Sequence, residues 1–264
     1  MRPILEVKDL TVTIGAKLVI DKISFDLYRE RVTALVGESG SGKTLAALSL
    51  LDLLPAVAVR KKGEVIFRGK NIFDLKYEEI RKIRGKSIAM VFQEPFTALN
   101  PVMRAGDQIS EVIVAHGDIT GTLAREKVLR LLDTVSLPRG TALSYPHELS
   151  GGMRQRIVLA MALACDPEVL LLDEPTTALD VSIQKEILDL IKDIQKEKRF
   201  AVLFITHDFS VVNMVADEVC VLKEGVMVEK AAKEDVLRRP ASGYTRKLIE
   251  CIPRLGDKRS RLPA

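Results

Sequence analysis

A glycine-rich segment between two apolar stretches is the feature that most constrains the fold of this chain. The segment fits the pattern G-x-x-x-x-G-K-[ST] without exception, and consists of Gly37, Glu38, Ser39, Gly40, Ser41, Gly42, Lys43 and Thr44. Its glycines allow backbone conformations that direct successive N–H groups at phosphate oxygens, and the following helix adds partial positive charge. In such a loop the lysine reaches the β- and γ-phosphates and the threonine hydroxyl ligates Mg²⁺. The sequence therefore predicts a nucleoside triphosphate site.

Short apolar runs alternate with helical patterns along most of the chain. Strands are expected at residues 4–7, 18–25, 32–36, 63–67, 88–92, 169–172, 201–206 and 218–222. Helices are expected at residues 45–54, 72–84, 107–116, 123–135, 151–164 and 183–197. Alternation of this kind predicts an α/β fold, a P-loop NTPase core whose mainly parallel sheet carries helices on both faces. The early strands form a separate antiparallel β subdomain in this prediction.

The predicted organisation is one domain over residues 1–253. A stretch that reads as helix throughout, at about residues 94–165, is expected to be an inserted all-helical lobe. The last residues, 254–264, combine Gly, Pro, Ser and basic side chains and are expected to be a mobile tail.

The charge balance argues against nucleic acid as a partner. The chain has 264 residues with 40 basic and 36 acidic side chains, a net charge of +4, and no long basic stripe with interleaved aromatics. Neither a signal peptide nor an apolar stretch of membrane-spanning length is expected, which favours a cytoplasmic location. The cysteines Cys165, Cys220 and Cys251 are far apart and are expected to be reduced thiols.

A second apolar run ends in two carboxylates. The run at residues 169–172 is followed directly by Asp173 and Glu174. In open α/β sheets, ligands bind beyond the carboxyl ends of the strands. Asp173 suits a Mg²⁺ shell, and Glu174 is placed to orient and deprotonate an attacking water.

These motifs, taken in order, resemble the ATP-binding subunit of ABC transporters. The segments that carry the resemblance are the phosphate loop, Gln93, the signature segment Leu149–Met153, Leu171–Glu174, Ala178–Asp180 and His207. The resemblance implies ATP and Mg²⁺ as ligands, with Gln93 at the metal and the attacking water. It also implies that His207 contacts the γ-phosphate.

The same resemblance implies a dimer of ATPase subunits. Ser150, Gly151 and Gly152 would contact the γ-phosphate held by another subunit, and Asp180 would lie across the interface. A helix N-terminus with a serine hydroxyl and free backbone N–H groups is a suitable anion site. The implied partners are a second ATPase subunit, two transmembrane permeases, and an extracytoplasmic solute-binding protein that acts through them. The implied location is the cytoplasmic face of the inner membrane, as a peripheral protein.

Four longer segments narrow the resemblance to importers of oligopeptides, dipeptides and nickel. They are Phe92–Pro101, Tyr145–Arg156, Asp173–Val181 and Gly243–Leu248. The short chain favours nickel or metal-chelate uptake, and di- or oligopeptide import is the alternative. DNA-repair ATPases need long heptad arms, and translation factors of the superfamily carry two tandem domains, so both are remote alternatives.

One position departs from the family pattern. Members of the family place an aromatic residue against the adenine, and the corresponding position is Ile14. Aliphatic contact is expected to replace base stacking, with weaker selectivity for adenine as the consequence.

Overall fold

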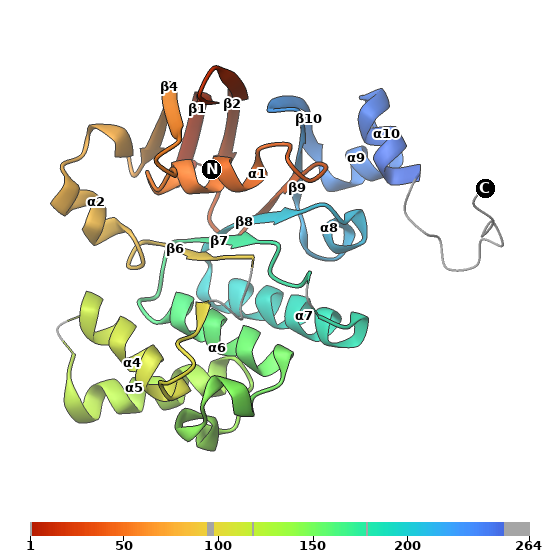
Figure 1. Ribbon diagram of the computed structural model, residues 1–264. Coiled ribbons are helices and arrows are strands. Elements are labelled where there is room, and N and C mark those ends of the chain that lie inside the picture. The colour runs from red at the N-terminus through yellow and green to blue at the C-terminus, as the bar shows by residue number, and fades with distance from the viewer. Residues whose placement is uncertain (1, 94–97, 118, 178, 251–264) are drawn as a thin grey trace.

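The structure, a computed structural model, describes residues 2–93, 98–117, 119–177 and 179–250. The tail predicted to be mobile at 254–264 and Ala178 lie outside the described residues. Two sheets and the helices that cover them account for the described part of the chain (Figure 1).

The first sheet is antiparallel and lies at the top of Figure 1. Its strands, in the order β2-β1-β4-β5, are β2 (Lys17–Leu27), β1 (Leu5–Ile14), β4 (Ala58–Phe67) and β5 (Lys70–Asn71). β1 alternates buried and accessible side chains over much of its length, as expected for a sheet packed on one face. The predicted antiparallel β subdomain is therefore present.

The second sheet is mainly parallel. Its strands, in spatial order, are β10 (Val226–Ala232), β9 (Glu218–Lys223), β3 (Val32–Val36), β8 (Ala201–Thr206), β7 (Val169–Asp173) and β6 (Ile88–Val91). Only β10 pairs antiparallel, with β9. Every residue of β3, β7 and β8 is buried, which is why these strands read as continuous apolar runs.

Helices cover both faces of this sheet. Helix α1 (Lys43–Leu50) packs between the two sheets, where its apolar face shares a core with β1, β2, β7 and β8. Helices α6 (Gly151–Leu163) and α7 (Val181–Lys198) cover the opposite face. The helical lobe packs against α6, and its elements are α4 (Ala105–His116), α5 (Gly121–Thr134), η2 (Arg139–Leu143) and η3 (Pro146–Glu148).

The remaining helices lie at the two edges. On the β6 side, the helix expected at 72–84 is divided into η1 (Ile72–Asp74) and α2 (Tyr77–Ile83), because Leu75 and Lys76 are extended. On the β9–β10 side lie α8 (Phe209–Val215), α9 (Lys233–Arg238) and α10 (Gly243–Glu250), which the apolar pattern does not predict. Each has eight residues or fewer, and β10 is mostly accessible, so their apolar periodicity is too short to detect.

Candidate functional site

The predicted site residues follow four parallel strands and lie at one edge of the sheet. The phosphate loop follows β3, Gln93 follows β6, Glu174 follows β7 and His207 follows β8. Because these strands are parallel neighbours, their carboxyl ends meet at the same edge. Motifs that are far apart in the sequence therefore lie close together in the fold.

The phosphate loop is held in shape by its own lysine. Lys43 is 5% exposed, and its Nζ donates to the carbonyl oxygens of Gly37 and Glu38 at 2.8 Å each. Burial lowers the pKa of Lys43, an effect opposed by the negative charges of Glu174 and Asp173. Gly42 has a φ of 101°, and a Cβ on it would lie 2.9 Å from the carbonyl oxygen of Val19. The loop therefore requires glycine at this position for both conformation and space.

A hydroxyl and a carboxylate face one another at the start of α1. The Thr44 hydroxyl donates to Asp173 Oδ1 at 3.3 Å, and Asp173 is 2% exposed. Burial raises the pKa of Asp173, and the hydrogen bond from Thr44 opposes this shift. A buried carboxylate with one oxygen donor beside it is well suited to ligate a small hard cation.

Glu174 is the point at which the other predicted residues converge. Its Oε1 lies 3.0 Å from His207 Nδ1, and its Oε2 accepts from Gln93 Nε2 at 3.3 Å. Thr177 Oγ1 donates to the same Oε2 at 3.0 Å. Both carboxylate oxygens are therefore oriented, by side chains that follow β6, β7 and β8.

The backbone of Glu174 is also unusual. Its φ is +46°, a left-handed conformation that few residues other than glycine adopt, and its N–H donates to the carbonyl oxygen of Ile205 at 3.0 Å. Strained non-glycine conformations of this kind cost about 1–3 kcal/mol and cluster at functional sites. The strain is maintained because the neighbouring strand β8 fixes the peptide.

A cavity of about 270 Å³ lies over these groups. It is lined by Ile14, Val19, Ser39, Gly40, Gly42, Lys43, Thr44, Leu45, Gln93 and Glu174. Ile14 and Val19 supply an apolar wall beside the polar loop, so Ile14, the residue predicted to contact adenine, belongs to the cavity lining. No aromatic side chain belongs to this lining among the described residues.

The signature segment is not part of this cavity. None of Ser150, Gly151 and Gly152 lines it. Ser150 is the N-cap of α6, and its exposed side chain accepts from the Met153 N–H at 3.3 Å. The N-terminus of α6 therefore has an exposed polar side chain that is not part of this chain's own nucleotide cavity.

Gly152 is buried against α7. A Cβ on Gly152 would lie 2.6 Å from Ile183 Cγ2. Asp180, the N-cap residue of the same helix α7, is exposed and makes no side-chain cap bond. The signature segment and Asp180 thus belong to helices that touch one another near their N-termini.

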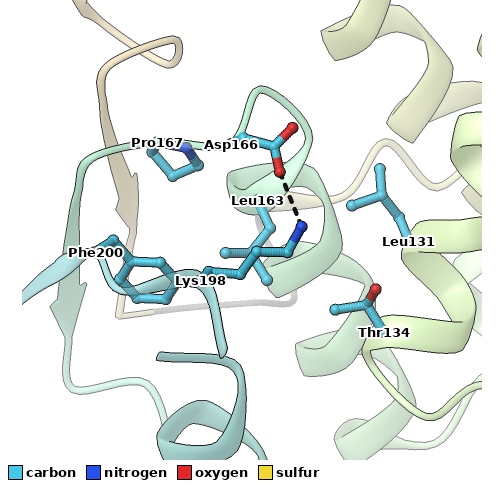
Figure 2. A pocket seen from close by; sticks show the side chains of 7 residues that line it. All are labelled: Leu131, Thr134, Leu163, Asp166, Pro167, Lys198 and Phe200. Carbon is cyan, nitrogen blue, oxygen red and sulfur yellow. Dashed lines mark hydrogen bonds and ion pairs between the residues drawn. The ribbon is translucent and has the colours of Figure 1, made fainter. Parts of the chain in front are cut away.

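A second hollow, of about 60 Å³, lies where the lobe joins the core, away from the predicted site residues (Figure 2). Its lining is largely apolar, with Leu131, Leu163 and Phe200 among its residues. Asp166 stands at its rim and pairs with Lys127 of α5 at 3.3 Å and with Lys198 of α7 at 3.2 Å. This cavity lies at the junction between the helical lobe and the sheet core, and we assign no chemistry to it.

Several residues of the site were not predicted. Thr177 is one of two threonines after Pro175, and the sequence does not show which of them faces Glu174. Val19 lines the cavity because β2 passes the loop, a long-range contact with no local signal. Their roles depend on tertiary placement.

Several known proteins resemble this chain over most of its length. The sequence profile of the ABC transporter family matches residues 20–177. The dipeptide transport ATP-binding protein DppD of Bacillus subtilis is 44% identical over 262 residues, 97% of this chain and 78% of DppD. The oligopeptide transport ATP-binding protein OppD of Bacillus subtilis is 43% identical over 259 residues, 96% of this chain and 72% of OppD. The glutathione import ATP-binding protein GsiA of Salmonella typhimurium is 44% identical over 248 residues, 91% of this chain but 40% of GsiA.

Solved structures share the fold. CbiO1 of Clostridium perfringens, part of the ABC transporter complex CbiONQ, has a TM-score of 0.81 at 28% identity, covering 90% of this chain and 92% of its own. A dimeric post-hydrolysis form of the cassette MJ0796, bound to ADP and Pi, has a TM-score of 0.74 at 27% identity, covering 87% and 98%. The predicted fold and family resemblance are both confirmed, and the chain belongs to the ABC transporter family as an ATPase coupled to transport.

Proposed function

We propose that this chain is the ATP-hydrolysing subunit of an importer of the di- and oligopeptide class. The observation that carries the proposal is Glu174, whose two carboxylate oxygens are oriented by Gln93, Thr177 and His207 beside a phosphate loop. Phosphoryl transfer depends on positioning and electrostatics more than on covalent chemistry, and this arrangement supplies both.

The proposed reaction is hydrolysis of the γ-phosphoryl group. A water molecule held at Glu174 attacks the γ-phosphorus, and the bond to the β–γ bridging oxygen breaks. The proton of the water passes to the Glu174 carboxylate. Gln93 and His207 orient the carboxylate, and Lys43 turns its ammonium from the loop carbonyls to the β- and γ-phosphates.

The residues present fit a magnesium ion. Thr44 and Asp173 would provide two oxygen ligands that lie 3.3 Å apart. Thr44 lines the cavity, as does Gln93, whose amide oxygen is a third candidate. When bound, Mg²⁺ neutralises charge on the β- and γ-phosphate oxygens. Burial raises the pKa of Asp173, so a cation bound beside it would favour its charged form.

The proposed working unit contains two ATPase subunits. The exposed Ser150 and the N–H groups of Gly151 and Gly152 form the N-terminal end of α6, and none of these residues lines this chain's cavity. We therefore infer that they serve the γ-phosphate of a partner ATPase, with Asp180 at the same interface. The proposed complex also contains two permeases and, through them, an extracytoplasmic binding protein. No helix among the described residues can cross a membrane, and the subunit is proposed to lie peripherally on the cytoplasmic face of the inner membrane.

Relatives favour peptides over nickel as the cargo. The relatives described above are named for dipeptide, oligopeptide and glutathione transport, and they do not support the nickel interpretation that chain length favours.

Measuring the uptake of peptides and of nickel by cells that lack this chain tests which solute is imported. We expect uptake of labelled di- or oligopeptides to fall to background in a deletion strain and to return with the wild-type gene but not with Lys43→Ala. Uptake of radioactive nickel, measured in the same cells, is expected to be unchanged. Loss of nickel uptake with intact peptide uptake would reverse the assignment.

The apolar wall at Ile14 leads to a prediction about how strongly the site prefers adenine to other nucleobases. Base–aromatic stacking contributes about 1–3 kcal/mol per base in single-strand binders, so its absence is expected to bring the dissociation constants of ATP and a base-altered triphosphate within about tenfold. Ile14→Tyr is expected to increase the preference for ATP. Equilibrium titration of both nucleotides measures this preference, and strong wild-type selectivity for ATP would show that Ile14 is not decisive.

A further inference from the structure

The last described helix reaches the phosphate loop. Tyr244, in the first turn of α10, accepts at its hydroxyl oxygen a hydrogen bond of 3.4 Å from the Glu38 N–H. The carbonyl oxygen of the same Glu38 accepts from Lys43 Nζ at 2.8 Å. Glu38 is therefore held at its N–H by Tyr244 and at its carbonyl oxygen by Lys43.

The position of Tyr244 is fixed by contacts that precede α10. Glu229 on β10 is 9% exposed, and its carboxylate accepts from the N–H groups of Ala241 at 2.8 Å and Ser242 at 3.1 Å. Ser242 Oγ then accepts from the Tyr244 N–H at 3.2 Å. A buried carboxylate with two backbone donors makes charge-assisted hydrogen bonds, so the start of α10 is anchored to the sheet.

The tyrosine ring is held as well. Lys223 Nζ, at the end of β9, lies 5.3 Å from the ring centroid, within range of a cation–π contact. Tyr244 also packs against the apolar cluster that contains Val36, the residue before the phosphate loop. Burial raises the pKa of Tyr244, so the hydroxyl remains protonated at neutral pH.

We propose that Tyr244 is a positioning residue for the phosphate loop. Its hydroxyl holds the Glu38 N–H, which keeps the first turn of the loop in the shape that receives the triphosphate. Gly225, whose N–H donates to the Ser41 carbonyl oxygen at 3.0 Å, anchors the middle of the loop in the same way. The segment after β9 thus braces the loop at two points.

The contribution of Tyr244 increases when nucleotide binds. Lys43 Nζ donates to the carbonyl oxygens of Gly37 and Glu38. Under the proposed function, on which this inference rests, the lysine transfers its ammonium to phosphate oxygens. The Tyr244 bond then remains to hold Glu38, and a loop that is already ordered loses less conformational entropy on binding ATP. The effect is therefore expected on nucleotide affinity, and not on the chemical step.

Tyr244→Phe removes only the hydroxyl and is the central test. With the full chain in its transport complex, we expect KM and Kd for ATP to rise about two- to tenfold, the range for one neutral hydrogen bond, while kcat stays within about twofold. Tyr28→Phe is the matched control, since its hydroxyl also makes a hydrogen bond of 3.4 Å, in this case as the donor to Asp26, and its side chain does not line the nucleotide cavity. We expect no change in KM for that control.

Two further variants separate positioning from general stability. Glu229→Gln weakens the anchor of α10 and is expected to raise KM for ATP in the same direction as Tyr244→Phe. Thr245→Val changes the next residue of α10, which is fully buried and whose hydroxyl has no hydrogen-bond partner among the described residues. It is expected to leave KM unchanged and the thermal unfolding midpoint no lower.

Three outcomes would overturn the inference: an unchanged KM in Tyr244→Phe, an equal rise in Tyr28→Phe, or a lower kcat and unfolding midpoint at constant KM. Wild-type protein that neither binds nor hydrolyses ATP would instead refute the proposed function. The two failures are therefore distinguishable in one set of measurements.

Discussion

Replacing Glu174 by Gln is expected to lower the steady-state rate of ATP hydrolysis by at least about 100-fold, the lower end of the range for a lost general base. Glutamine keeps the shape of the side chain and can still accept hydrogen bonds from Gln93, Thr177 or His207. What it loses is the capacity to take a proton from water at neutral pH. The fall in rate should therefore appear in kcat.

Nucleotide affinity is the internal control for this variant. Glu174 belongs to the cavity lining but not to the phosphate loop, so the Kd for ATP from equilibrium titration should stay close to the wild-type value. Glu186→Gln, which removes only an ion pair to Arg156 from an exposed carboxylate, should hydrolyse ATP normally. Near-normal turnover in Glu174→Gln would transfer the role of base to another group.

The second large effect is expected for Ser150→Arg. A bulky cation at the N-cap of α6 fills the space where the partner's γ-phosphate is proposed to bind, and we expect ATP hydrolysis to fall to background. The isolated subunit should bind ATP with nearly unchanged affinity, because Ser150 lines no part of its own cavity. Hydrolysis by the assembled complex and titration of the monomer measure the two halves of this prediction.

A matched variant controls for the loss of the N-cap hydrogen bond that Ser150→Arg also causes. Losing the bond from the Met153 N–H costs about 1 kcal/mol, a small shift in the unfolding midpoint. Thr120→Arg places the same side chain at the exposed N-cap of α5, where the wild-type side chain makes no cap bond, and should leave hydrolysis intact. Reduced ATP affinity in monomeric Ser150→Arg would contradict a role across the subunit interface.

Much of the fold could be predicted because its signals are local. β3, β7 and β8 are continuous apolar runs since both of their faces are buried, and the glycine pattern after β3 has few structural alternatives. The apolar run before Glu174 predicts its place at the carboxyl end of a strand, whereas the role of His207 rests on the family resemblance. Their mutual contact follows from parallel strand order.

The elements that escaped prediction depend on distant contacts. β10 is an edge strand with few buried side chains, and α10 has a single buried residue, Thr245. The start of α10 is held by hydrogen bonds from Ala241 and Ser242 to Glu229 on β10, and both elements pack on β9. These contacts join residues that are distant in the sequence, so local patterns do not reveal them. Chain length, the basis for favouring nickel, has no physical connection to the cargo, and that inference is the one the relatives do not support.

The contact between Gly152 and Ile183 has a consequence for how two subunits communicate. Because a Cβ on Gly152 would lie only 2.6 Å from Ile183 Cγ2, α6 and α7 pack closely at their N-terminal ends, and we expect these ends to move together as one lever. The signature segment projects from one arm of the lever and Asp180 from the other. Under the proposed dimer, we therefore expect a partner subunit that displaces either arm to displace both, so that the signature segment and Asp180 would respond together to the neighbouring nucleotide.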